Sequence, residues 1–71
     1  MKYFFHIVGH DKLQVDRSGE NFVDPENMKD HARFLAKDLS GAGLRGYTLV
    51  VAKENGDIAY RMEIEPKVRA G

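Results

Sequence analysis

Three histidines are the side chains of this 71-residue chain that titrate near neutral pH, so they are the first candidates for chemistry. His6 and His10 stand four residues apart, with Asp11 next, a spacing that puts two metal ligands on one face of a helix. The residues around them instead predict a strand and the turn after it, over which four residues extend by ~13 Å. We therefore expect surface histidines here and no metal site. His31 borders the apolar stripe of a predicted helix and is expected to cap the edge of the core, because no nucleophile is directed at it.

The acidic residues and the glycines give no stronger sign of an active site. Five carboxylates fall close together without the one-three-five ligand order of a calcium loop, namely Asp11, Asp16, Glu20, Asp24 and Glu26. The glycines between 41 and 46 follow a helix and enter a strand, so no helix N-terminus is directed at a phosphate. The chain has no cysteine, which excludes thiol nucleophiles and thiolate ligands. We predict that the protein is not an enzyme and has no cofactor.

The strands and the helix that must position these residues follow in the order β-β-α-β-β. Aromatic and β-branched residues, alternation and turn signals predict strands over 3–8, 13–16, 47–52 and 58–64. Asp24-Pro25-Glu26 predicts a helix start, with an acceptor at the N-cap and proline at N1, and apolar residues continue at helical spacing to about Ser40. Asp16 to Gly19 is predicted to form a turn, and Asn55-Gly56 a hairpin turn.

The predicted elements assemble into one layer of sheet and one helix. A right-handed crossover from the second strand to the third places the first strand between them. The sequence thus predicts an α+β fold, in which a four-stranded antiparallel sheet of order 2-1-3-4 packs one face against the helix. The length suits a single domain, which we assign to residues 1–65, and residues 66–71 are predicted to form a flexible tail.

One helix covers one side of such a sheet, so the other side is expected to be exposed. We assign to the helix side Tyr3, Phe5, Ile7, Leu13, Val15, Leu49, Val51, Ile58, Tyr60, Met62 and Ile64. The opposite side then carries Phe4, His6, Val8, Thr48, Val50, Ala52, Ala59, Arg61 and Glu63. The centre of this second side is apolar, and exposed apolar patches mark interaction sites. We predict an interaction face made of Phe4, His6, Val8, Val50 and Arg61.

Three interpretations of that face stay open. In the first, it contacts a second copy, giving a homodimer, or another protein, which would enlarge the core of a small domain. In the second, Phe4, His6 and Arg61 stack on and bind single-stranded nucleic acid. Eleven basic residues balance eleven acidic ones, which disfavours a phosphate-binding protein. In the third, a one-residue slip in one strand exchanges its two sides.

We expect neither a targeting segment nor a membrane span. The apolar start is too short for a signal peptide, and no run approaches the ~18 apolar residues of a membrane span. Small secreted domains usually depend on disulfides, so the absence of cysteine favours a soluble, cytoplasmic protein.

Several short motifs together resemble a known family. They are Tyr3-Phe4-Phe5-His6, Asp16-x-x-Gly19, Asp24-x-Glu26 before a helix with Ala32 and Ala36, and Val51-x-x-Glu54-x-Gly56. These motifs are similar to those of a family of short bacterial proteins classed as a domain of unknown function, over nearly the whole chain from Tyr3 to about Ile64. Met28 departs from the pattern, at a position where alanine is expected. The resemblance implies a small stand-alone bacterial protein and transfers no catalytic residue.

Overall fold

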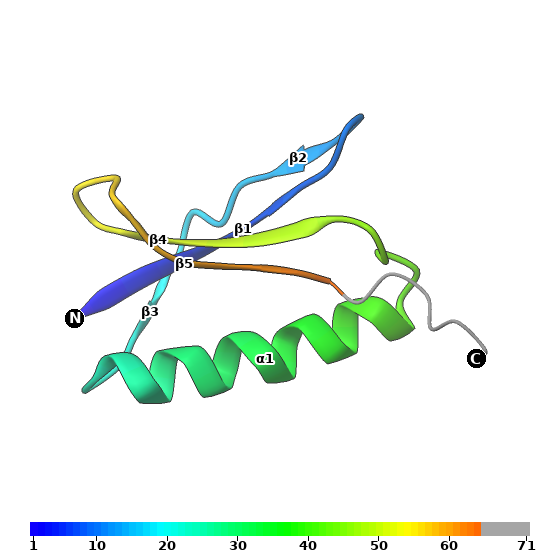
Figure 1. Ribbon diagram of the computed structural model, residues 1–71. Helices are drawn as coiled ribbons and strands as arrows, with labels where there is room; N and C mark the ends of the chain where they lie inside the picture. Colours follow the sequence, from blue (N-terminus) through cyan, green and yellow to red (C-terminus); the bar gives the residue numbers. More distant parts are fainter. Residues whose placement is uncertain (65–71) are drawn as a thin grey trace.

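The computed structural model describes residues 1–64. The elements are β1 (Lys2–Val8), β2 (Leu13–Gln14), β3 (Glu20–Asn21), α1 (Pro25–Gly41), β4 (Thr48–Lys53) and β5 (Ile58–Glu63). Figure 1 shows α1 lying along one side of the sheet. The predicted domain boundary at Glu65 and the predicted tail of residues 66–71 lie outside the described residues, so both stay predictions.

The strands form one antiparallel sheet in the order β2-β1-β4-β5, and β3 also pairs with β1. This confirms the predicted α+β class, with one helix on an antiparallel sheet. The strand order differs from the predicted one by β3 alone. The turn at Asp16–Gly19 interrupts the edge strand, and the chain then returns to β1 at Glu20–Asn21. Two residues are too short a run for the alternation that predicts a strand, so β3 was missed.

The core fills the space between the sheet and α1. Phe5 lies opposite Val51, and Ile7 lies opposite Leu49, so the inward side chains of the two central strands stand together. The buried cluster consists of Tyr3, Phe5, Ile7, Met28, Ala32, Ala36, Leu49, Val51 and Ile64. The helix approaches the sheet through two alanines, and Met28 is one of the largest fully buried side chains. The departure from alanine at position 28 therefore supplies volume to the core.

Both ends of α1 have side-chain or backbone caps. The Asp24 carboxylate accepts a hydrogen bond of 2.9 Å from the Asn27 N–H, as expected for the predicted N-cap. At the other end, Gly43 has φ of +91°, and the Leu44 N–H donates back to the Leu39 carbonyl at 3.0 Å. This is a Schellman motif, which ends the helix and directs the chain into β4. The helix ends at Gly41, one residue beyond the prediction.

The predicted side of Ile58 and Ala59 is wrong. Val51 lies opposite Tyr60, but Ala52 lies opposite Ile58, so a bulge adds one residue to β5 at Ala59. Ala59 packs against the core, and the Ile58 residue is 52% exposed. A bulge shifts the alternation by one residue on one side of it, and nothing in the local sequence signals this one.

The predicted side of Leu13 is also wrong. Leu13 lies opposite Val8, and Gln14 lies opposite Ile7, so Gln14 is the residue of β2 that shares a side with the core. Leu13 is 63% exposed, and Val15 lies beyond the end of the strand with about half of its surface exposed. The turn at residues 9–12 fixes the register of the hairpin, and this register decides which side of the sheet Leu13 faces. The apolar pattern of so short a strand does not decide it.

Candidate interaction face

The strand registers place the five predicted face residues on one side of the sheet, away from α1. His6 lies opposite Val50, and Val50 in turn lies opposite Arg61. Phe4 and Val8 alternate with the buried residues of β1 and so lie on the same side as His6. We call this side, with Leu13, Thr48 and Glu63 added, the uncovered face. Leu13 was missed because it was assigned to the helix side.

The Asp16–Gly19 turn packs over one corner of the uncovered face. A Cβ atom on Gly19 would stand 2.9 Å from Cε2 of Phe4, and Gly19 has φ of +74°, so glycine is required at this position. The Phe4 and His6 rings are nearly parallel, with their centroids 6.5 Å apart, and the Lys2 ammonium lies 5.9 Å from the Phe4 centroid. Phe4 and His6 are consequently half-buried rather than open.

The Asp16 carboxylate fastens this turn to β1. One oxygen accepts from the Phe5 N–H at 3.1 Å, and the other accepts from the N–H groups of Ser18 and Gly19. Burial opposes ionisation of the carboxyl group, but these three N–H donors outweigh burial and lower the pKa of Asp16. The carboxylate takes the place of a strand partner for the Phe5 amide, in the gap between β2 and β3.

His6 is held by the same turn. Its Nδ1 accepts a hydrogen bond of 3.1 Å from the Asp16 N–H, so this nitrogen carries no proton. His6 therefore serves the turn rather than a metal through Nδ1. His10 lies exposed in the turn after β1. Within residues 1–64 no group of three or more His, Cys, Asp or Glu side chains is arranged to hold a metal ion.

His31 lies at the edge of the core, as predicted. Its ring meets the Phe5 ring edge-on at 5.2 Å and lies 5.3 Å from the Phe22 ring. Its Nε2 lies 3.4 Å from an oxygen of the Glu20 carboxylate. The two side chains form an ion pair when His31 is protonated. The histidine thus joins α1 to β3, in addition to the backbone pairing that holds β3 on β1.

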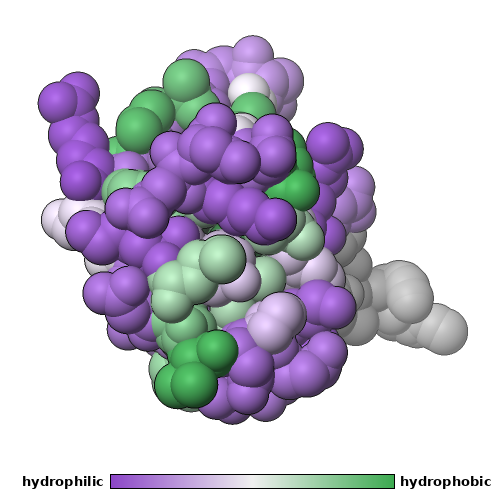
Figure 2. Space-filling view, turned by 90° about the vertical axis from the view of Figure 1, so that its left-hand side faces the viewer, coloured by the Kyte–Doolittle hydropathy of each residue, from purple (hydrophilic) through white to green (hydrophobic). Residues whose placement is uncertain are grey.

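The uncovered face is hollowed beside β5. A shallow cavity of about 490 Å³ is lined by Val8, Thr48, Val50, Arg61, Met62 and Glu63. Figure 2 views the molecule from the end that carries the β4–β5 turn, and green apolar surface lies at the top, on the side of the sheet away from the helix. Leu13 and Val8 extend the apolar surface toward β2. The face therefore has an apolar centre, with Arg61 and Glu63 at its β5 edge.

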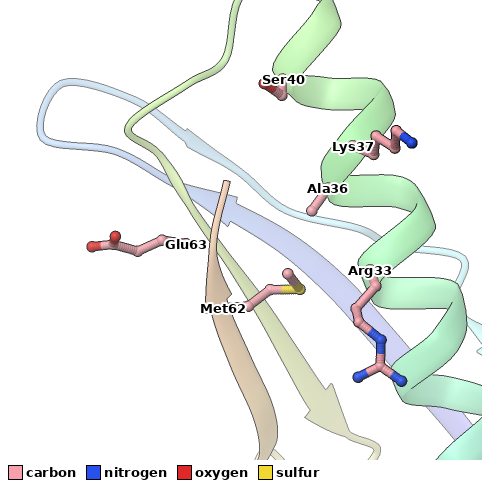
Figure 3. Close-up of a pocket in the computed structure, with 6 residues that line it drawn as sticks. All are labelled: Arg33, Ala36, Lys37, Ser40, Met62 and Glu63. Carbon is pink, nitrogen blue, oxygen red and sulfur yellow. The ribbon is translucent and has the colours of Figure 1, made fainter. Parts of the chain in front are cut away.

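A second groove lies on the helix side of β5. Its volume is about 350 Å³, and its lining consists of Arg33, Ala36, Lys37, Ser40, Met62 and Glu63. Figure 3 shows Met62 of β5 and Ala36 of α1 extending toward one another, while Glu63 points away from the helix.

No helix among residues 1–64 combines the length and the apolar character that a membrane crossing needs.

These features define a class of protein, a small two-layer α+β domain whose described residues include no set of groups arranged as a metal centre. Residues 2–65 match the family model described as Domain of unknown function (DUF6894). The chain belongs to this family, which confirms the resemblance drawn from the motifs. No curated protein and no solved structure was found to match the chain.

Proposed function

We propose that this small bacterial protein is a non-enzymatic interaction module that self-associates through the uncovered face of its sheet. The observation that carries the proposal is the apolar centre of that face, where Val8, Leu13 and Val50 stand beside one another on three adjacent strands. The helix leaves this side of the sheet free. A chain of 71 residues buries a limited core, and a second copy is the simplest source of additional buried surface.

Burial of apolar surface on this face is the expected driving force of the contact. Burying about 400 Å² of apolar surface is worth on the order of 10 kcal/mol before the costs of association, at ~25 cal/mol per Å². Arg61 and Glu63 at the rim supply one charge of each sign, so a face that meets a copy of itself about a two-fold axis can match opposite charges. We further expect the protein to act in the cytoplasm, because a cysteine-free domain does not depend on an oxidising compartment.

The test is the molar mass in solution by light scattering, over a range of concentrations. We expect a mass above that of the monomer, which Leu13→Glu and Phe4→Glu both reduce. Leu13 is the sharper probe because it is 63% exposed, so a charge there costs the fold little. Phe34→Glu is the matched control, since Phe34 is 65% exposed but lies on α1. A monomer mass at high concentration, or a mass that Leu13→Glu leaves unchanged, would contradict self-association through this face.

A second candidate function is binding of single-stranded nucleic acid. The near-parallel rings of Phe4 and His6, with the Lys2 ammonium beside them, favour it. The equal numbers of basic and acidic residues disfavour it. A fluorescent oligouridine would then bind with an affinity that falls steeply with salt and is lost in Phe4→Ala. Self-association, in contrast, depends mainly on apolar burial and responds little to salt.

A further inference from the structure

The outer edge of β5 has no strand partner among residues 1–64. An open edge presents unpaired peptide groups and is a template for another strand. The opposite edge of the sheet differs, because it is divided into two strands of two residues each. Between them, the Asp16 carboxylate accepts the hydrogen bond of the Phe5 N–H. β5 is instead a strand of six residues without proline, and its part from Tyr60 to Glu63, beyond the bulge at Ala59, is regular, so this part of the edge is suited to pairing.

The hydrogen bonds to β4 decide which peptide groups of β5 are directed outward. The Ile64 N–H donates to the Tyr47 carbonyl at 2.8 Å, toward the inside of the sheet. Alternate residues of an antiparallel strand share one direction, so Met62 bonds toward β4 as Ile64 does. The N–H and C=O groups of Arg61 and Glu63 are then directed to the open side.

The side chains of β5 are complementary to a second β5. Arg61 and Glu63 are exposed, stand two residues apart and share one side of the strand. An antiparallel pairing about a two-fold axis at Met62 places Arg61 opposite Glu63 of the second copy, and Glu63 opposite Arg61 of that copy. Opposite charges directly across a strand pair stabilise it. The same register makes the outward peptide groups of Arg61 and Glu63 the hydrogen-bonded pairs.

On the helix side, the same register closes the groove of Figure 3. Met62 lies in that groove, opposite Ala36 of α1. At the two-fold axis Met62 meets Met62 of the second copy as a non-hydrogen-bonded pair, the kind in which side chains approach most closely. The flexible thioether side chain fills irregular apolar space, which suits a groove of about 350 Å³.

We propose that β5 pairs with β5 of a second copy in this register, so that two sheets continue into one. The contact uses the peptide groups of the edge, Met62 on the helix side, and Arg61 and Glu63 at the rim of the uncovered face, and it does not need the apolar centre of that face. Where both contacts form and their two-fold axes cross at right angles, the particle is a tetramer with two kinds of two-fold interface. Where one forms alone, the particle is a dimer.

Met62→Cys tests the register directly. A non-hydrogen-bonded pair has Cα atoms about 4.5 Å apart, which lies within the range that a disulfide spans. The chain contains no other cysteine, so oxidation can give a single product. We expect a disulfide-linked dimer that forms ~10-fold faster or more than in Arg61→Cys, because residue 61 faces residue 63 of the second copy and not itself. Equal rates for the two variants would overturn the proposal.

Charge exchange in the Leu13→Glu background gives a second test, because Arg61 and Glu63 also lie at the rim of the uncovered face. Arg61→Glu and Glu63→Arg each place like charges across both pairs, so each variant alone should lose the edge contact. Mixing the two restores opposite charges at both pairs, and we expect the mass to recover in the mixture. A mixture with no more association than either variant alone would contradict the edge register.

A Leu13→Glu background separates this proposal from self-association through the uncovered face. If Met62→Cys still cross-links rapidly in that background, the edge contact is independent of the face. If cross-linking falls to the rate of Arg61→Cys there, the edge does not pair by itself and the proposal fails.

Discussion

At the scale of single residues, Asp16 joins its turn to β1 through hydrogen bonds of both its side chain and its backbone. Its carboxylate accepts hydrogen bonds from the N–H groups of Phe5, Ser18 and Gly19, and its own N–H donates to His6. We expect Asp16→Ala to lower the free energy of unfolding by about 2 kcal/mol, because the half-buried Phe5 amide loses its acceptor. Asp16→Asn keeps one oxygen but turns an N–H group toward other donors, so it should recover little of the loss. Urea unfolding measures both changes.

The lowered pKa of Asp16 makes stability depend on pH in one direction. The ionised form is favoured in the folded state, so its contribution is present in full above the ordinary value of 3.8. It decreases as the pH falls below that value and is lost once the pH has fallen through the lowered folded-state pKa. Thermal unfolding across this acid range should show a smaller pH dependence in Asp16→Ala than in the unchanged chain. Equal slopes would exclude the carboxylate as the source.

Two glycine positions differ in the space available for a side chain, and alanine substitution at each tests that difference. A Cβ atom on Gly9 would stand 2.4 Å from the Tyr47 ring, whereas a Cβ atom on Gly41 meets no atom within 4 Å. We expect Gly9→Ala to destabilise the fold by about 1–3 kcal/mol, since the ring and the β1–β2 turn must separate. Gly41→Ala, at the last residue of α1, should be neutral or stabilising by up to about 1 kcal/mol. Similar melting temperatures for the two variants would contradict this reading of the contact.

At the scale of elements, the sequence predicts what local chemistry determines. Asp24 and Pro25 mark the start of α1, and Tyr3 to Val8 has the composition of a central strand, and the structure agrees at both places. The errors occur where tertiary pairing decides the outcome. The sides of Leu13 and Ile58 depend on a hairpin register and on a bulge, and neither feature leaves a local signal strong enough to read.

The candidate site was predictable to the same extent. Phe4, His6, Val8, Val50 and Arg61 share one side of the sheet because their strands alternate regularly. The covering of Phe4 by Gly19 was not predictable, since it requires the Asp16–Gly19 turn to fold back over the sheet. Leu13 joins the face only through the register of the hairpin.

At the scale of the whole molecule, the two sides and the two edges of the sheet are unequal. One side is covered by α1, and one edge is interrupted and tied down by Asp16, which leaves one face and one edge for contacts. The measured particle mass distinguishes the two proposals when the paired charge variants are compared in a Leu13→Glu background, because Leu13→Glu removes the face contact while Arg61 and Glu63 lie both on the edge and at the rim of the face.

The hydrogen bond from the Phe5 amide to Asp16 also bears on how far an assembly can grow. A sheet with one open edge can pair once about a two-fold axis, and growth then stops, because neither copy has an edge left. A sheet with two open edges can add copies without end and form a filament. Within residues 1–64, the edge formed by β2 and β3 offers no continuous strand to a further copy, because each of the two strands has two residues and the Asp16 carboxylate accepts from the Phe5 amide between them, so we expect growth to stop at the β5 pair.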